Sequence, residues 1–460
     1  MVFSSTTFLF LFLPLVLLLY YNPFWQSRSF KNNFLLLASL GFYAWGEPVF
    51  VFLMLLSILI TWLIGLQLHK GVGKGFLALG IIYHVVVLFI FKYLTFVLHE
   101  MQLLAGSLSA ATVQIALPIG ISFFTFQLMS YLFDIYYGKA EAQKNPLAVG
   151  LYVALFPQLI AGPIVRYDYI ARQLQQRRES IFKFSSGMER FVIGLGKKVL
   201  IADYMAAIAD VYFDSGAELS VLSAWLGAIA YTLQIYFDFS GYSDMAIGLG
   251  RMFGFDFAEN FNYPYMAKSV TDFWRRWHIS LSSWFRDYVY IPLGGNRTGR
   301  LRWIANFSLV WLLTGIWHGA NWTFIVWGLI YLVALLAEKL SGMDKRTGIF
   351  TRTYTLLIIV LAWVIFRADS LASGVKYIGY MLGLYGNAFA DDVFVDILSG
   401  STWLLVIAIG GSFAVVRDMF ARLARTRYAW VKQLCLFVVF VLSLLQISSS
   451  SYSPFIYFNF

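Results

Sequence analysis

Long apolar runs separated by short polar stretches dominate this chain of 460 residues. A transmembrane α-helix needs about 20 predominantly apolar residues to cross the hydrocarbon core of a bilayer. The pattern therefore predicts roughly 11–12 membrane-spanning helices of that length. The expected spans are residues 7–21, 32–46, 49–68, 76–98, 117–137, 188–212, 221–239, 303–318, 321–340, 353–367, 401–416 and 431–448.

Four further apolar stretches are shorter or interrupted, and they lie near residues 147–165, 242–257, 270–292 and 371–385. We interpret them as re-entrant or interfacial helices, because interrupted backbone at membrane depth is tolerated only where it is buried in protein or lines a cavity. No polar stretch is long enough for a separate water-soluble domain. The sequence thus predicts an all-α, polytopic membrane protein in which residues 1–460 form a single membrane domain.

The composition supports this class of protein, since 60% of the residues are hydrophobic and only 13% are charged. Soluble domains average about 25% charged residues. The net charge of +10 does not indicate nucleic-acid binding, because the basic residues form short blocks between apolar runs, as the positive-inside rule expects. Membrane lipid and anionic ligands are the expected partners. The single cysteine, Cys435, excludes a disulfide within the chain and makes a thiolate nucleophile or cysteine metal site unexpected.

The first apolar run, residues 8–21, predicts a retained span rather than a secretory signal. No lysine or arginine precedes it, and no small-residue cleavage site follows it. The first cations, Arg28 and Lys31, come after this run, which predicts an extracytoplasmic N-terminus. Alternation of the later spans leaves the C-terminal segment 453–460 outside as well.

The segment from Phe273 to Gly319 contains several arginines and two of the five histidines among apolar runs. His318 ends the run 307–317. Desolvation there favours a neutral imidazole, which can take a proton from an attacking hydroxyl. Gly319 leaves room for another backbone or a substrate to approach closely. The alternative is a packed histidine bonded to a helix carbonyl, and the spacing alone does not decide between the two.

His278 lies in the short amphipathic sequence RRWHIS, close to Arg275, Arg276 and Arg286. Aromatic and basic residues commonly anchor helices at a membrane interface, and this is the simpler interpretation. The functional interpretation is that the three arginines line a cytoplasmic entrance and bind the phosphates of a donor molecule.

Three aspartates, Asp238, Asp244 and Asp272, lie close to this segment in the sequence. An uncompensated carboxylate in an apolar run is costly, so we expect each to pair with one of the nearby arginines. A role in orienting a histidine is the alternative. The chain lacks the Walker, GxGxxG and HExxH patterns, and we expect no metal site.

Several motifs together resemble the membrane-bound O-acyltransferase family. They are YFDFSGYSDMAIGLGRMFGF (236–255), FWRRWHISLSSWFRDYVYIPLGGN (273–296), WHGANW (317–322), LPIGISFFTFQ (117–127), LFPQLIAGPIVR (155–166) and WVIFRAD (363–369). The core motifs fall in 117–166 and 236–322, and the resemblance covers the whole chain. Within the family it is greatest to the alginate O-acetylase branch.

The resemblance implies a ring of tilted helices around a central tunnel, in a bacterial inner membrane. His318 matches the catalytic histidine of the family, and His278 matches its second functional histidine. No permanently bound cofactor is implied. Acetyl-CoA would serve as the cytoplasmic donor, and an extracytoplasmic partner acetyltransferase would pass the acetyl group to a polysaccharide such as alginate.

Other functions remain open at this level. Within the enzyme class, the alternatives are D-alanyl transfer to teichoic acid and acetylation of cellulose or peptidoglycan. A polymer or lipid transporter, or a scaffold for an exported acetyltransferase, would share the membrane composition. A transporter predicts paired halves or charges spread over several spans, whereas the charges here gather in one segment.

Overall fold

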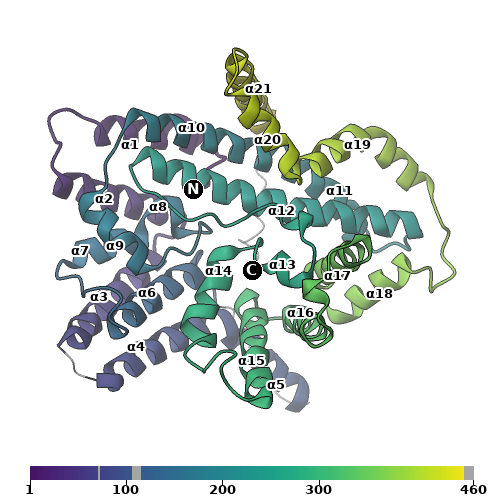
Figure 1. Ribbon diagram of the computed structural model, residues 1–460, viewed down its shortest axis with the longest axis horizontal. Helices are drawn as coiled ribbons and strands as arrows, with labels where there is room; N and C mark the ends of the chain where they lie inside the picture. Colours follow the sequence, from purple (N-terminus) through teal and green to yellow (C-terminus); the bar gives the residue numbers. More distant parts are fainter. Residues whose placement is uncertain (71–72, 106–114, 450–460) are drawn as a thin grey trace. The chain divides into compact units, whose positions relative to one another are not determined.

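The computed structural model describes residues 1–70, 73–105 and 115–449 (Figure 1). Within these ranges the regular structure is helical, without strands, as the sequence predicts. Six helical segments are long and apolar enough to cross a membrane: α3 (Phe50–His69), the segment Gly73–Leu103, α16 (Trp322–Ser341), α17 (Ile349–Arg367), α19 (Asp392–Gly411) and α21 (Ala429–Ser449). The protein is therefore a multi-pass membrane protein. The expected C-terminal segment 453–460 lies outside the described residues.

The chain divides into two compact units, and each is described by itself. The first comprises residues 1–191 and 245–258. Besides α3, it contains π-helical turns at Phe8–Phe12 and Phe89–Tyr93 and the helices α1 (Leu13–Tyr20), α2 (Arg28–Gly46), α4 (Gly73–Leu88), α5 (Leu94–Ala105), α6 (Ile121–Tyr136), α7 (Pro146–Ala154), α8 (Phe156–Leu159) and α9 (Tyr167–Gln176).

The second unit comprises residues 192–244 and 259–460, as far as they are described. Besides α16, α17, α19 and α21, it contains α11 (Asp203–Phe213), α13 (Val270–Trp274), α14 (Ile279–Phe285), α15 (Arg300–His318), α18 (Leu371–Met381) and α20 (Ala414–Leu423). π-Helical turns occupy Lys197–Ala202 and Arg286–Tyr290, and 3-10 turns occupy Pro264–Met266 and Met343–Lys345. Two helices, α10 (Ile181–Gly196) and α12 (Val221–Met252), contribute residues to both units.

The apolar pattern locates most helices well. Helices α3, α15, α16, α17 and α21 coincide closely with expected spans. The interrupted stretch 270–292 is indeed broken, into α13, α14 and a π-helical turn. The expected spans 76–98 and 401–416 overlap the apolar segment Gly73–Leu103 and α19, which are also long enough to cross a membrane. The other expected spans, 303–318 among them, are mainly helical but are shorter or less apolar than a membrane crossing requires.

Two expected boundaries are wrong. The stretches 221–239 and 242–257 form one helix, α12, of 32 residues. Glycine does not interrupt it at Gly241, because a Cβ there would lie 2.8 Å from the carbonyl oxygen of Gly194, so Gly241 allows close packing against α10. Helix α19 begins nine residues before the expected 401, since the Asp391 side chain caps it by accepting from the Phe394 N–H at 2.8 Å.

Candidate active site

The motif WHGANW folds as a turn between two tightly packed helices, α15 and α16. Helix α15 ends at His318, and the Asn321 side chain caps α16 by accepting from the Thr323 N–H at 3.0 Å. The helices approach closely because a Cβ on Gly315 would lie only 2.6 Å from the carbonyl oxygen of Phe324. The short turn thus fixes His318 at a defined helix end.

The His318 ring is enclosed by aromatic side chains and is only 3% exposed. Trp317, Trp327 and Phe366 meet it edge-on, with ring centroids at 5.0, 4.8 and 5.2 Å. The expected space beside Gly319 is occupied, since a Cβ there would lie 2.3 Å from the Phe324 ring. Gly319 therefore accommodates an aromatic ring of the same chain, and the expectation that it leaves room for another backbone or a substrate was wrong.

His278 lies in the chain between α13 and α14 in a left-handed conformation, with φ 44° and ψ 53°. Such a backbone is uncommon for a residue other than glycine and costs of order 1–3 kcal/mol, so the surrounding structure must hold it in place. The imidazole is fully buried, and the Phe239 ring packs edge-on against it at 4.7 Å. Strain of this kind at a buried histidine is typical of functional positions.

The structure brings the two predicted histidines together around one indole. The ring centroid of Trp317 lies 5.8 Å from that of His278 and 5.0 Å from that of His318. The two imidazoles, separated in the chain by α14 and α15, therefore belong to one buried site in the second unit.

Asn260 fixes the orientation of His278. Its Oδ1 faces the backbone N–H of Ser280 at 3.2 Å, and a backbone N–H can only donate. The amide nitrogen on the other side donates to Ser243 Oγ at 3.0 Å, which supports the same orientation. Asn260 Oδ1 also lies 3.3 Å from His278 Nδ1. An acceptor at that distance requires Nδ1 to carry the proton, so Nε2 holds the lone pair of the neutral ring.

Burial acts on the charge of the same ring. His278 lies outside the six apolar spans, and burial lowers its pKa to about 3. The imidazole is consequently neutral at physiological pH, with the tautomer that Asn260 selects. A ring in this state can accept a proton or a hydrogen bond at Nε2.

A buried carboxylate positions the segment that leads to His278. Glu338 on α16 is 1% exposed and accepts hydrogen bonds from the N–H groups of Val270 and Thr271 at 2.6 and 2.9 Å. It also accepts from Thr271 Oγ1 at 2.8 Å. The carboxylate thereby satisfies the donors at the start of α13 and joins α13 to α16. The two helices are neighbours in the second unit (Figure 1).

The three expected phosphate-binding arginines differ in their surroundings. Arg275 is exposed. Arg276 pairs with Asp272 at 3.0 Å, and Arg286 donates to both carboxylate oxygens of Asp287, at 2.7 and 3.1 Å. Two of the three guanidinium groups are therefore already held by carboxylates. That the three arginines bind the phosphates of a donor molecule stays a prediction.

The aspartates of α12 pair with lysines. Asp238 lies 3.1 Å from Lys198, and Asp244 lies 2.7 Å from Lys197. The expectation of arginine partners was wrong for these two, because α12 packs against the helix that carries Lys197 and Lys198. It is confirmed for Asp272, which pairs with Arg276.

The structure also identifies residues that the sequence did not single out. Asn260, Ser280 and Glu338 act through hydrogen bonds between segments distant in the chain, which an apolar pattern cannot show. Glu338 did leave a signal, since it is an acidic residue within the otherwise apolar run 322–340. Trp317 lies inside a quoted motif, but its position between the histidines depends on the fold.

Membrane-crossing helices and two buried histidines around one tryptophan define the class: a multi-pass membrane protein with a histidine-based candidate active site. Comparison with known proteins identifies the family within this class. The model of the membrane-bound O-acyltransferase family matches residues 37–374. The chain belongs to this family, as the sequence motifs indicated, and it is an O-acyltransferase.

Three relatives show the extent of the similarity. A probable alginate O-acetylase of Pseudomonas putida is 41% identical, over the full length of both chains. A probable alginate O-acetylase of Pseudomonas aeruginosa is 45% identical over 81% of this chain and 73% of its own. A peptidoglycan O-acetyltransferase of Helicobacter pylori is 35% identical over 100% of this chain and 98% of its own.

Proposed function

We propose that this O-acyltransferase takes acetyl groups from acetyl-CoA on the cytoplasmic side and passes them across the membrane for O-acetylation of an extracytoplasmic polysaccharide such as alginate. The full-length similarity to probable alginate O-acetylases supports the acetyl group and the polymer. The arrangement of His318, Trp317 and His278 carries the proposal, because it gathers two imidazoles in a site from which bulk water is excluded.

The proposed chemistry needs one base. His318 takes the proton of an acceptor hydroxyl while the oxygen attacks the thioester carbonyl carbon. The C–S bond then breaks, the new ester forms, and the imidazolium returns its proton to the departing thiolate. In a variant of this scheme His318 itself attacks the carbonyl and briefly carries the acetyl group. His278, neutral and fixed by Asn260, accepts a hydrogen bond at Nε2 within the same site.

The donor is a polyanion, so the proposal assigns its phosphates to Arg275, with Arg276 and Arg286 contributing to the local field. Because aromatic rings cover His318 and Trp327 packs on Phe366 at 5.2 Å, the thioester must displace at least one of the surrounding rings to reach the imidazole. We expect no resident cofactor or metal in this reaction.

Partner and location complete the proposal. The acetyl group passes to an extracytoplasmic partner acetyltransferase, and the protein lies in a bacterial inner membrane with its N-terminus outside. The position of Arg28 and Lys31 after the first apolar helix supports this orientation.

The test uses the purified full chain in lipid nanodiscs with labelled acetyl-CoA, and it measures the release of coenzyme A. His318→Ala should reduce the rate by at least a hundredfold, since general-base catalysis contributes about 10²–10⁴. His69→Ala is the matched control, because His69 is an exposed histidine at the end of α3 in the other unit. Wild-type rates in a folded His318→Ala protein would contradict the proposal.

A second acceptor is favoured by one observation, the similarity to the peptidoglycan O-acetyltransferase over nearly its whole length. Analysis of the ester-linked acetyl content of exopolysaccharide and of peptidoglycan after deletion of the gene separates the two acceptors. Use of a D-alanyl donor in place of acetyl-CoA in the nanodisc assay would instead favour teichoic acid chemistry.

A further inference from the structure

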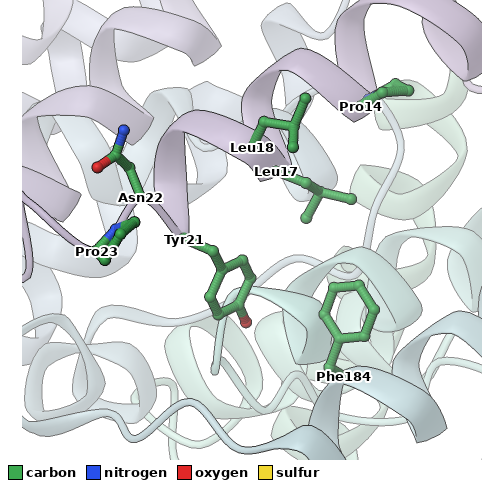
Figure 2. Close-up of a pocket in the computed structure, with 7 residues that line it drawn as sticks. All are labelled: Pro14, Leu17, Leu18, Tyr21, Asn22, Pro23 and Phe184. Carbon is green, nitrogen blue, oxygen red and sulfur yellow. The ribbon is translucent and has the colours of Figure 1, made fainter.

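An apolar groove lies on the first unit, at the end of α1, and shares no residue with the candidate active site (Figure 2). It encloses about 580 Å³. Tyr21 and Phe184 form one wall, with their rings in edge-to-face contact at 5.8 Å, and Leu17 and Leu18 extend it. Leu18 is 73% exposed. The groove therefore presents an open apolar surface.

Three cations surround one carboxylate beside this groove. Glu179 accepts two hydrogen bonds from Arg28, at 2.5 and 2.9 Å, and lies 3.9 Å from Arg177 and from Lys31. Burial opposes ionisation of Glu179, but the hydrogen bonds from Arg28 and Tyr20 outweigh it and lower its pKa to about 2. The carboxylate is thus ionised and still leaves the cluster with an excess of positive charge.

The cations differ in what else they contact. The Arg177 guanidinium is buried and donates to Tyr20, Asn32 and the carbonyl oxygen of Phe253. Arg28 donates hydrogen bonds to Glu179 and to the carbonyl oxygen of Arg177. Both arginines are therefore fixed by several protein acceptors.

Lys31 is held less firmly. Its ammonium has the 3.9 Å ion pair and no hydrogen bond among the described residues. It lies 5.8 Å from the ring centroid of Tyr21, the residue that lines the groove. Burial lowers the pKa of Lys31, and Arg28 and Arg177 lower it further against the opposing effect of Glu179. An anion at this position would relieve the repulsion between the cations.

We propose that this groove binds an anionic phospholipid, with one acyl chain against Leu17, Leu18 and Phe184 and the headgroup phosphate at Lys31. Two observations support the two parts of this ligand, its acyl chain and its phosphate. The apolar wall matches a hydrocarbon chain, and the positive excess beside it matches a phosphate. A zwitterionic lipid also carries a phosphate, but its headgroup cation cancels that charge, so it would compensate the positive excess less well than an anionic lipid.

The test is native mass spectrometry of the full chain with equal amounts of phosphatidylglycerol and phosphatidylcholine. The wild type should retain phosphatidylglycerol preferentially. Lys31→Met keeps an unbranched side chain and removes the charge, so we expect this preference to fall about fivefold, as for one cation near a membrane surface. Lys183→Met is the matched control, because Lys183 adjoins Phe184 but pairs with Asp256 at 2.5 Å.

Two further arms keep the proposal testable. Inorganic phosphate at millimolar concentration should not displace the lipid, and displacement would show a simple phosphate site and overturn the proposal. In the wild type, phosphatidylglycerol with a photoreactive acyl chain should label residues 14–23 or 184. Equal labelling by phosphatidylcholine, or an unchanged lipid preference in Lys31→Met, would also overturn it.

Discussion

Replacement of Asn260 by leucine should reduce catalysis without removing either histidine. Leucine has a similar volume and no hydrogen-bonding group. Asn260 Oδ1 accepts from the Ser280 N–H at 3.2 Å, from Ser280 Oγ at 2.9 Å and from His278 Nδ1 at 3.3 Å, and all of these groups are buried. Without the acceptor, His278 loses the partner that selects its tautomer.

The magnitude follows from those contacts. Leaving a buried donor without its acceptor costs about 1–3 kcal/mol. If this cost falls on the reactive arrangement of His278, kcat decreases by roughly 5- to 150-fold. The backbone bond from the Ile279 N–H to the carbonyl oxygen of Asn260, at 3.0 Å, does not depend on the side chain. The left-handed turn at His278 should therefore persist in the variant.

Asn260→Asp distinguishes positioning of His278 from general structural support. A carboxylate keeps the acceptor but raises the pKa of His278, which burial otherwise lowers to about 3. The wild-type ring is neutral from about pH 5 to 8. In the variant, activity should be retained at the upper end of this range and lost as the pH falls through the raised pKa. Asp238, Asp244 and His318, the titratable groups on the elements around the site, are present in both the wild type and the variant. A difference between the two pH profiles therefore reports on His278.

The assay is coenzyme A release in nanodiscs across this pH range, with thermal unfolding as the check on folding. Ser243→Ala is the matched control, because it removes the bond to the amide nitrogen of Asn260 and leaves Oδ1 in place. Wild-type kcat in a folded Asn260→Leu protein, or the same pH profile in Asn260→Asp as in the wild type, would refute this reasoning.

Three more predictions address the surroundings of the site. Glu338→Ala should lower the free energy of unfolding by about 1.5–3 kcal/mol, because the donors at the start of α13 lose a charged acceptor. Thermal unfolding measures this change, and an unchanged midpoint would contradict the prediction. Gly319→Ala should cost about 1–3 kcal/mol and reduce kcat, because the new Cβ displaces the Phe324 ring, which packs on Phe366, and Phe366 in turn packs on His318. Full activity together with full stability would refute the close packing. Arg275→Gln should raise the KM for acetyl-CoA by about two- to fivefold, as for an exposed charge, and more than Arg286→Gln does; equal KM values would exclude Arg275 from donor binding.

The sequence predicts the helices of this protein better than their connections. Runs such as 49–68 and 321–340 coincide with α3 and α16 because their apolar length alone determines them. The expected stretches 221–239 and 242–257 divide α12 in two. In the fold, Gly241 instead allows close packing against α10, and the nearby Asp238 and Asp244 are neutralised by Lys198 and Lys197. Such pairing depends on tertiary contacts, which the hydrophobic periodicity of the sequence does not predict.

The candidate site shows the same division. His318 and His278 were identifiable because polar residues in apolar surroundings are conspicuous. Resemblance to a family indicated a function for both, but only the structure shows that they meet around Trp317, since nothing in the spacing brings position 278 to position 318. Asn260 and Ser280 could not be found in this way, because asparagine and serine are common in loops and their role depends on hydrogen bonds across 18 and 2 residues to His278.

The ion pairs between α12 and the turn at Lys197–Ala202 have a consequence for how the chain is synthesised into the bilayer. Without α12, Lys197 would lose Asp244, and Lys198 would lose Asp238 but keep Asp203 at 2.7 Å. An unpaired charge at the centre of an inserting helix costs about 2.5–3.5 kcal/mol. Lys197 and Lys198 emerge from the ribosome well before Asp238 and Asp244. We therefore expect the segment that carries Lys197 to stay out of the hydrocarbon until α12 has been synthesised, so that the two elements take their final positions together.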